Sequence, residues 1–265
     1  MTTGALRGLT VVVTRPARQS IRLTRQLAAA GAEVLRFPAV EIAPPVAPEV
    51  ERAMLHAAWQ DADYAVFVSA NAVRHAVSLL GGRRLPQGGP RLVCVGPATA
   101  RALRRAGRAP DVQPRAGYTS EALLAEPAFA GDLSGSQVLV VRGDGGRELL
   151  STTLRERGAR VTRVSVYRRL CPRYEAADIE AVWLRPQPPD VVTVTSPGIV
   201  DNLLLLLDSG PARERLLASQ LVVVSPRMVQ KLAEAGFYRA PLIAENATDE
   251  ALVECIAGWR DGDSR

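Results

Sequence analysis

The amino-acid sequence contains one long internal repeat, and this repeat constrains the fold more than any other feature of the chain. The spacing between the two copies is 127 residues, as from Gly4 to Gly131, and Ser69 and Ser196 still obey it. The matching residues of the first copy are Gly4, Leu6, Gly8, Val11, Val13, Arg15, Leu23, Leu27, Gly31, Ala32 and Val34. Their counterparts in the second copy are Gly131, Leu133, Gly135, Val138, Val140, Arg142, Leu150, Leu154, Gly158, Ala159 and Val161.

Further along the chain the spacing of the repeat increases to 129 residues, as a loop insertion would cause. Leu92–Gly107 then matches Leu221–Gly236, and Thr119–Leu123 matches Thr248–Leu252. Solenoid units have periods of about 20–50 residues, so this repeat is too long to be one of them. It predicts a duplicated half-protein, in which a ligand site is expected between the copies.

Both copies alternate short apolar runs with helical patterns. The runs with the length and composition of buried strands are Leu9–Thr14, Tyr64–Ser69, Arg91–Val95, Gln137–Val141, Asp190–Thr195 and Leu221–Val224. A stretch with helical periodicity follows each run, such as Asn71–Leu80 or Pro97–Ala106. Apolar strands alternating with helices indicate parallel sheets covered on both faces. We therefore expect an α/β fold of two doubly wound parallel-sheet domains that arose by internal duplication.

Two extended segments interrupt this alternation. Val34–Ile42 and Arg160–Arg169 occupy equivalent places in the two copies, are longer than a core strand requires, and are followed by prolines. We interpret their distal ends as the crossings between the domains, paired as a two-stranded antiparallel linker.

The composition restricts the class of protein. The 265 residues suffice for two domains with separate cores, and 47% hydrophobic residues are typical of a globular protein. No apolar stretch approaches the roughly 18 residues of a membrane-spanning helix, and the N-terminal residues lack the pattern of a signal peptide. The three cysteines are scattered without metal-binding spacing. We therefore expect a cytoplasmic protein that does not associate with a membrane.

The net charge of +6 comes almost entirely from arginine. A genome rich in G and C explains this composition as well as a functional requirement does. The functional explanation is a partner with several carboxylates, which guanidinium groups bind in bidentate fashion. Nucleic acid is not expected, because the basic residues are dispersed and only 5% of residues are aromatic.

Polar or glycine-containing turns follow the predicted strands. They are Ser69–Asn71, Gly96–Thr99, Arg142–Gly146, Ser196–Gly198 and Ser225–Arg227. Ligands of open α/β sheets bind at this edge, where the N–H groups and dipole of each following helix favour an anion. An ordinary helix cap is the better explanation of any single turn. Five such turns, repeated across two domains, favour a shared anionic ligand.

Several common catalytic motifs are absent from the sequence. It contains no G-x-G-x-x-G fingerprint after the first strand, no P-loop and no G-x-S-x-G elbow. The two histidines, His56 and His75, lie in helical patterns, which argues against histidine-based acid–base catalysis. No metal site is expected either, because His and Cys residues with ligand spacing are missing.

Taken in order, several segments resemble the uroporphyrinogen-III synthase family. They are VVVTRP, FPAVEI, FVSANAVRHA, VCVGPATARAL, GYTSEAL, VLVVRGDGGREL, VSVYRR and VTVTSPGIVDNLL. The resemblance spans Leu9 to about Ile256, and the order and spacing of these segments carry it.

The resemblance implies a domain plan and a reaction. One domain would be discontinuous and contain residues 1–38 and 171–265, while residues 39–170 would form the other, with the linker strands at its ends. The implied enzyme is a hydro-lyase of tetrapyrrole (haem) biosynthesis. It would remove water from hydroxymethylbilane, invert the last pyrrole through a spiro intermediate and close the ring to uroporphyrinogen III. No cofactor is implied. The expected partner is this small-molecule substrate with its eight carboxylates, and we expect a monomer.

The resemblance also implies roles for individual residues. Tyr167 matches the tyrosine proposed to assist loss of the hydroxyl group, because a phenol can donate a proton to the leaving oxygen. Stabilisation of the linker strands is the alternative role of this tyrosine. Thr99 matches a threonine that binds an acetate or propionate side chain. The other expected substrate-binding residues are Arg15, Ser69, Asn71, Arg142, Gly143, Gly145, Ser196, Gly198, Ser225 and Arg227.

One turn departs from the family pattern. Ser225-Pro226-Arg227-Met228 stands where the family commonly has a Gly-Pro-Thr-Thr-like turn. This change is compatible with carboxylate binding by Arg227 and also with a relative that has lost the activity. A non-catalytic module that senses a tetrapyrrole or another anion is therefore the alternative function. A bilobed glycosyltransferase or solute-binding protein is a third, disfavoured by the missing nucleotide loop and signal peptide.

Overall fold

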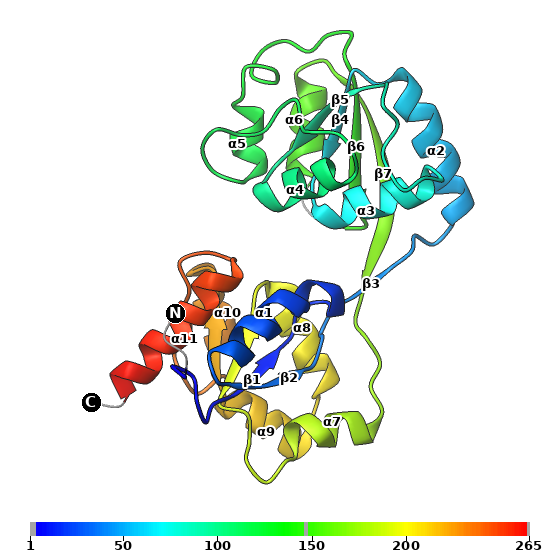
Figure 1. Ribbon diagram of the computed structural model, residues 1–265. Coiled ribbons are helices and arrows are strands. Elements are labelled where there is room, and N and C mark those ends of the chain that lie inside the picture. The colour runs from blue at the N-terminus through cyan, green and yellow to red at the C-terminus, as the bar shows by residue number, and fades with distance from the viewer. Residues whose placement is uncertain (1–3, 146–147, 264–265) are drawn as a thin grey trace. The chain divides into compact units, whose positions relative to one another are not determined.

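The computed structural model describes residues 4–145 and 148–263, apart from the side chains at positions 261 and 263. The chain divides into two compact units (Figure 1). The first unit contains Met1–Glu41 and Leu170–Arg265, and the second contains Ile42–Arg169. Each unit has a five-stranded sheet in which the strands of the centre run parallel, so the expected α/β fold with parallel sheets is confirmed.

The sheet of the first unit has the strand order β10-β9-β8-β1-β2. Its strands are β1 (Thr10–Val13), β2 (Glu33–Arg36), β8 (Val191–Val194), β9 (Gln220–Val223) and β10 (Leu242–Ile243). Neighbouring strands are parallel throughout. The strand β1 lies between β2 and β8 and pairs Val11 with Val191. The N-terminal segment therefore completes a sheet whose other half comes from the C-terminal part of the chain.

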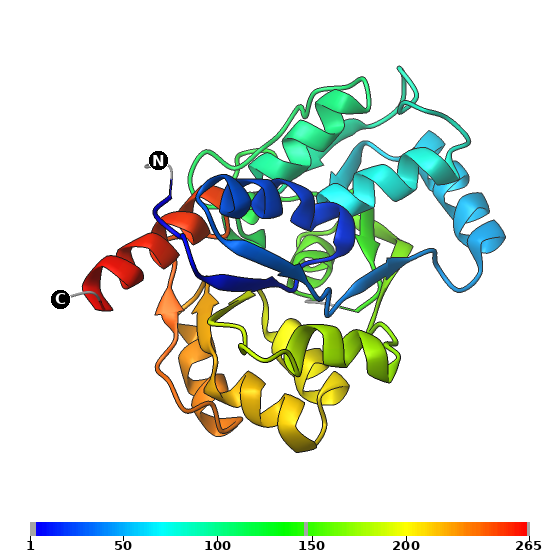
Figure 2. The same ribbon diagram turned by 60° about the horizontal axis from the view of Figure 1, so that its bottom comes forward.

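Helices cover both faces of this sheet, as Figure 2 shows. One face carries α1 (Ala17–Ala29) and α11 (Asp249–Asp263), which pack on Val11 and Val13. The helices of the other face are α7 (Ala176–Trp183), α8 (Pro197–Leu206), α9 (Gly210–Ala218) and α10 (Arg227–Glu234). They pack on Val12, which follows from the alternation of side chains along a strand. None of the helices among the described residues is long and apolar enough to cross a membrane.

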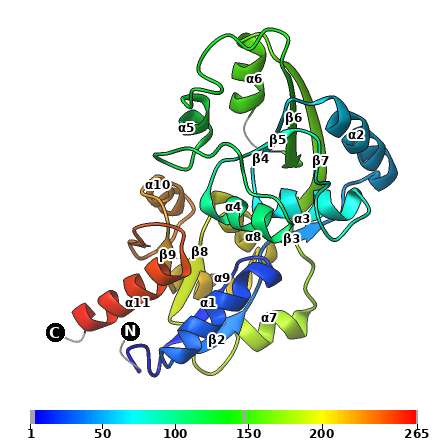
Figure 3. The same cartoon turned by 45° about the horizontal axis from the view of Figure 1, so that its top comes forward.

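The sheet of the second unit has the strand order β3-β7-β6-β4-β5. Its strands are β3 (Glu41–Ala43), β4 (Tyr64–Phe67), β5 (Arg91–Cys94), β6 (Gln137–Gly143) and β7 (Arg160–Leu170). The pairs β4–β5, β4–β6 and β6–β7 are parallel. The helices α2 (Pro48–Asp61), α3 (Ala70–Leu79) and α4 (Pro97–Arg105) cover one face. The helices α5 (Ser120–Leu124) and α6 (Leu149–Glu156) cover the other, and Figure 3 shows α6 and α2 on opposite sides of β6 and β7.

The expected extended segment Val34–Ile42 is not one strand. It consists of the end of β2, an irregular stretch from residue 37 to 40, and the start of β3. Phe37 is buried, and its ring stacks on Tyr174 with 4.2 Å between centroids, while Pro38 has no N–H group for a ladder. Packing of Phe37 therefore interrupts the strand. The expected segment Arg160–Arg169 is the strand β7, which pairs with β6 and has β3 as its other neighbour.

The strand orders identify the topological switch point of each sheet, where the connections leave two neighbouring strands in opposite directions. In the first unit the chain moves from β1 outward to β2 and from β8 outward to β9 and β10. In the second unit it moves from β4 outward to β5 and from β6 outward to β7. The pairs β1–β8 and β4–β6 are therefore the topological switch points, beside which ligands of such sheets bind.

Candidate functional site

The switch point of the second unit contains a small cavity of about 260 Å³, at the C-terminal ends of β4, β6 and β7. The residues that line it are Val68, Ser120, Val140, Arg142, Gly143, Gly145, Leu150, Ser151 and Arg169. Two guanidinium groups, two hydroxyl groups and the backbone of a glycine turn are thus brought together. These groups include many hydrogen-bond donors, so the cavity suits an anionic or strongly polar ligand group.

An irregularity in the pairing of β6 and β7 places Tyr167 next to residues of this cavity. Arg142 pairs with Ser165, but the next residue, Gly143, pairs with Tyr167, so Val166 is an extra residue in β7. An extra residue reverses the alternation of side chains beyond it. Val166 and Tyr167 consequently both pack into the core under α2, α3 and α4. The β-bulge therefore directs the ring of Tyr167 toward α3.

The hydroxyl group of Tyr167 is held by two polar side chains. Arg169 donates a hydrogen bond from Nη2 to the phenol oxygen at 3.0 Å, and Ser69 Oγ lies 3.2 Å from the same oxygen. The guanidinium carbon of Arg169 also lies 5.6 Å from the centre of the ring. The ring of His75, on α3, lies 5.5 Å from that of Tyr167 with an interplanar angle of 32°. Tyr167 is 0% exposed, so its phenol is buried and oriented by these partners.

Gly143 lies directly against the ring of Tyr167. A Cβ atom at position 143 would be 2.5 Å from Cζ of the tyrosine, which is far inside van der Waals contact. The glycine is therefore required by the close approach of the aromatic ring, in addition to any contact that its backbone makes with a ligand.

Arg142 is buried beneath the glycine turn that follows β6. Its Nε donates to the carbonyl oxygen of Gly143 at 3.2 Å, its Nη1 donates to Glu148 Oε1 at 3.0 Å, and its Nη2 bonds the carbonyl oxygen of Gly145. The guanidinium group therefore holds the shape of the turn, and the carboxylate of Glu148 balances its charge. Gly146, which was expected in this turn, lies outside the described residues.

Asn71 and Thr99 do not join the residues that line the cavity. They lie in the first turns of α3 and α4, where they are 8% and 5% exposed. The amide oxygen of Asn71 accepts a hydrogen bond from Arg74, and the backbone N–H of Thr99 donates to Gly96 at 3.0 Å. Both side chains belong to the closely packed helix starts on the α3 and α4 face of the sheet.

In the first unit, Arg15 follows β1 at the switch point, at the place in the repeat that corresponds to Arg142. Its Nη1 donates to Asp249 Oδ1 and its Nη2 to the carbonyl oxygen of Ala247, both at 2.6 Å. Its Nε lies 3.4 Å from Thr195 Oγ1. Burial lowers the pKa of Arg15, and the charge and hydrogen bond of Asp249 oppose this effect. The guanidinium group thus joins the turn after β8 to the beginning of α11.

The remaining candidates of the first unit lie on the turns after β8 and β9. Ser196 precedes α8 and Gly198 is exposed in its first turn; within the described residues no side chain caps this helix. The N-terminus of α8 therefore keeps backbone donors for an anion. Ser225 Oγ accepts from the backbone N–H of Arg227 at 3.4 Å, and the side chain of Arg227 is exposed at the start of α10.

Several residues of the site in the second unit were not predicted from the sequence, and Ser151, which lines the cavity, is one of them. Arg169 follows Tyr167 by two positions in a strand, and that spacing puts side chains on one face, so the strand period was an available signal. Ser120 directly follows Thr119, the residue that caps α5. The alternation of strands and helices puts this helix start at the C-terminal edge of the sheet, so this signal was available for Ser120. The ring of His75 lies beside that of Tyr167, and nothing in the sequence indicated this contact.

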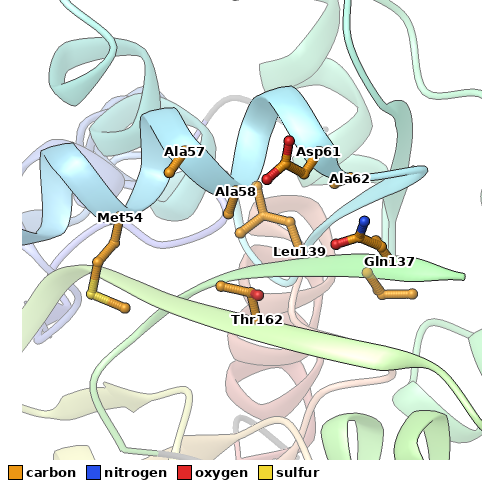
Figure 4. A pocket seen from close by; sticks show the side chains of 9 residues that line it. Met54, Ala57, Ala58, Asp61, Ala62, Gln137, Leu139 and Thr162 are labelled. Carbon is orange, nitrogen blue, oxygen red and sulfur yellow. The ribbon is translucent and has the colours of Figure 1, made fainter.

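A second cavity, of about 280 Å³, lies between α2 and the strands β6 and β7 (Figure 4). The residues that line it are Met54, Ala57, Ala58, Asp61, Ala62, Gln137, Val138, Leu139 and Thr162. Gln137 begins β6, so this cavity is at the opposite end of that strand from the glycine turn. Its lining is mainly apolar, and its charged group is the carboxylate of Asp61, which repels anions. The cavity at the switch point is therefore the better candidate for an anionic ligand.

Comparison with known proteins identifies the family to which this arrangement belongs. A family model described as "Uroporphyrinogen-III synthase HemD" matches residues 21–254. The uroporphyrinogen-III synthase of Escherichia coli (strain K12) is 31% identical over 251 residues, which cover 94% of this chain and 100% of the relative. The protein of the same name from Synechococcus elongatus is 32% identical over 259 residues, covering 95% of this chain and 96% of the relative.

Solved structures show the same fold. A mutant uroporphyrinogen III synthase from the extremely thermophilic bacterium Thermus thermophilus matches with a TM-score of 0.61 and 23% identity, covering 97% of this chain and 99% of that one. Uroporphyrinogen-III synthetase from Helicobacter pylori 26695 matches with a TM-score of 0.62 and 17% identity, covering 95% of this chain and 100% of that one. Because the family model spans most of the sequence and the relatives align over nearly their full length, the chain belongs to the uroporphyrinogen-III synthase family.

Proposed function

We propose that the chain is a uroporphyrinogen-III synthase, a hydro-lyase that removes water from hydroxymethylbilane and inverts the terminal pyrrole while closing the ring. One observation carries this proposal: relatives that bear this enzyme name align with nearly the entire chain at 31% and 32% identity. The alternative of a non-catalytic sensing module is not favoured, because the relatives matched over the same length are named as enzymes.

The substrate carries eight carboxylates, and we propose that the turns at the C-terminal edges of the sheets bind them. In the second unit the donors are the hydroxyl of Ser69, the guanidinium-supported turn of Gly143 and Gly145, and the side chains that line the cavity of about 260 Å³. Arg142 contributes by holding this turn, since its own N–H groups are directed to protein oxygens. Asn71 and Thr99 would support the starts of α3 and α4.

In the first unit, we propose that carboxylates bind at the start of α8 and at the exposed guanidinium group of Arg227. Ser196 and Gly198 present a helix N-terminus without a side-chain cap among the described residues. Arg227 replaces the hydroxyl groups of the usual family turn by a cation, which binds a carboxylate through a charge-assisted hydrogen bond. Ser225 supports this turn, and Arg15 supports the adjoining one.

Catalysis then consists of assisted loss of a hydroxyl group and control of conformation. The carbon that loses the hydroxyl is activated by its own pyrrole ring, so modest proton donation suffices. Tyr167 is the residue that we propose as the source of the proton for this step, because its hydroxyl group is fixed by Ser69 and Arg169 at the switch point. Holding the two ends of the substrate together, with the last ring turned over, provides the remaining rate enhancement.

We propose further that the two units are the domains of the enzyme, with boundaries near residues 38 and 171, and that they arose by duplication. The central strands support this, because the orders β2-β1-β8-β9 and β7-β6-β4-β5 are equivalent when the strands are matched by the repeat. Gly31 and Gly158, which correspond in the repeat, have positive φ angles of 98° and 91°. Thr119 and Thr248, which also correspond, both cap helices by accepting a backbone N–H.

Three finer points also belong to the proposal. The strands β3 and β7 are neighbours in the sheet and would form the antiparallel linker. The scattered cysteines and the dispersed arginines are the basis for proposing a cytoplasmic enzyme that does not bind nucleic acid. A monomer is proposed because all the turns expected to bind substrate are contained in one chain.

A coupled assay tests this function. Hydroxymethylbilane is generated from porphobilinogen by its own synthase, the chain is added, the products are oxidised, and the uroporphyrin isomers are separated by chromatography. We expect a shift from isomer I, the product of spontaneous closure, to isomer III. Isomer I alone, from protein shown to be folded by circular dichroism, would contradict the proposal and favour the sensing module.

A further inference from the structure

The hydroxyl group of Tyr167 lies at the candidate site but has no accessible surface, since the residue is 0% exposed. Ser69, which contacts this hydroxyl at 3.2 Å, is half-buried and lies at the sheet edge before α3. We propose that Ser69, and not Tyr167, delivers the proton to the leaving hydroxyl group, and that Tyr167 supplies the proton from behind it. This inference rests on the proposed function and assigns the donor for its first step.

The hydrogen bonds of the two hydroxyl groups show how many protons the pair can donate. A guanidinium group only donates, so the phenol oxygen of Tyr167 accepts from Arg169 at 3.0 Å. Ser69 Oγ accepts from the backbone N–H of Ala72 at 3.0 Å. The contact between the two oxygens needs one proton, while the two hydroxyl groups carry two. One proton therefore remains to be donated outside the pair.

Burial decides which of the two protons is available. Around the phenol, the positions of Arg169, the ring of His75 and Gly143 leave the tyrosine without exposed surface. If the phenol donates its proton to Ser69 Oγ, that oxygen accepts two hydrogen bonds, one from Tyr167 and one from the N–H of Ala72. The proton of the Ser69 hydroxyl group then points away from Tyr167. Ser69, which is half-buried, is then the donor that a ligand can reach.

The transfer balances without any further reactant. The C–O bond of the substrate breaks, the electron pair leaves with oxygen, and that oxygen takes the proton of Ser69 to form water. Ser69 takes the proton of Tyr167, and the resulting phenolate is stabilised by the positive charge of Arg169. When the ring closes, the pyrrole carbon that forms the new bond loses a proton, which returns to the phenolate.

A double-mutant cycle tests this relay in the full-length protein. Ser69→Ala and Tyr167→Phe should each lower kcat for isomer III by about 10²-fold, because each removes one link of the same donor chain. The double variant should be no slower than the slower single variant, since residues that act as one unit are not additive. Ser69→Thr, which keeps a hydroxyl group and a helix cap, should restore most of the activity.

Two control variants separate this effect from general structural damage. Tyr64→Phe matches the tyrosine change, because Tyr64 also accepts from an arginine, Arg91 at 3.3 Å, with the guanidinium 5.3 Å from its ring centre, and it lies at the start of β4. Thr119→Ala matches the loss of a helix cap, since Thr119 Oγ1 accepts from Ala122. Both should keep wild-type kcat. Ser69→Gly repeats the loss of the hydroxyl with a smaller loss of helix capping, in case Ser69→Ala does not fold.

The outcomes discriminate between the inference and the function. Wild-type kcat in folded Ser69→Ala or Ser69→Gly would overturn the inference, whether or not Tyr167→Phe is impaired. A double variant that shows the product of the two single losses would overturn it as well, because the residues would then act independently. If the wild-type chain itself makes no isomer III, the proposed function fails and the relay fails with it.

Discussion

At the scale of the residue, Gly143 has a role that its position in a turn does not reveal. A Cβ atom at this position would approach Cζ of Tyr167 to 2.5 Å, so only glycine leaves room for the ring. We expect Gly143→Ala to displace the ring, to lower the free energy of unfolding by about 1–3 kcal/mol and to reduce isomer III formation. Urea unfolding and the coupled assay measure these two effects.

Gly131→Ala is the matched control for that change, because no atom lies within 4 Å of a Cβ built at Gly131 and its φ is not positive. It should leave the unfolding midpoint and the activity near those of the wild type. Equal losses for both variants would show that the effect comes from the backbone of glycine in general and not from the contact with Tyr167.

Some of the site residues could be predicted from the sequence. The others could not, for physical reasons. The turn of Gly143 and Gly145 could be predicted because it follows an apolar strand, at the edge of the sheet where ligands bind. The direction of the Tyr167 ring was not, since it depends on the β-bulge at Val166, which no glycine or proline marks. The burial of Arg142 could not be predicted either, because a local sequence does not show with which carbonyl groups a guanidinium group will form hydrogen bonds.

At the scale of the element, Arg15 holds the start of α11 to the centre of its sheet. The side chains of Arg15 and Asp249 are only 11% and 13% exposed, so removing the guanidinium leaves a partly buried carboxylate without its close ion-pair partner. We expect Arg15→Ala to lower the free energy of unfolding by about 2–4 kcal/mol. Arg22 also lies near Asp249, at 3.9 Å, but is 65% exposed, so Arg22→Ala should cost less than about 1 kcal/mol. Urea titration of both variants is the measurement, and equal losses would contradict a specific role for Arg15.

The irregular stretch between β2 and β3 is held in a similar way by Tyr174. Its hydroxyl donates to the carbonyl oxygen of Pro38 at 2.9 Å, and its ring stacks on Phe37. Burial, followed by the nearby charge of Asp178, raises the pKa of Tyr174 from 10.0 to about 12. The folded protein thus favours the protonated phenol, and this contribution to stability is complete below pH 10 and is lost as the pH rises toward 12.

A comparison with Tyr174→Phe measures this contribution. The variant should be less stable than the wild type at about pH 8, because the hydrogen bond to Pro38 is missing. The difference between the two free energies of unfolding should then shrink as the pH rises from 10 to about 12. A difference that stays constant over this range would show that the phenol does not titrate differently in the folded and unfolded chains.

The pattern of elements was the most predictable level of the structure. Strands such as Tyr64–Phe67 and Val191–Val194 are continuous apolar runs, and their length and flanking turns identify them without tertiary information. The break of the segment Val34–Ile42 was not predicted, because it results from packing of Phe37 against Tyr174 and Trp183, which are distant in sequence. Long-range aromatic contacts of this kind override a local preference for an extended strand.

At the scale of the whole molecule, each unit has its own hydrophobic core on both faces of its sheet. In the second unit these cores involve only residues between 42 and 169, and its strands pair among themselves. We expect a fragment of residues 41–170 to fold alone, with a cooperative urea transition followed by circular dichroism. A fragment of residues 1–41 should stay unfolded, because β1 lacks its neighbour β8. An unfolded 41–170 fragment would contradict this independence.

The position of β1 between β2 and β8 also has a consequence for synthesis on the ribosome. Val11 pairs with Val191, so the first strand to emerge must wait for a partner that is translated about 180 residues later, roughly 10–40 s at bacterial elongation rates. During this interval the segment 42–169 can complete its sheet, while the apolar edge of β1 remains open to chaperones or to misassembly. The N-terminal strand is thus made first and incorporated late, and nascent chains arrested before β8 should be the most dependent on chaperone protection.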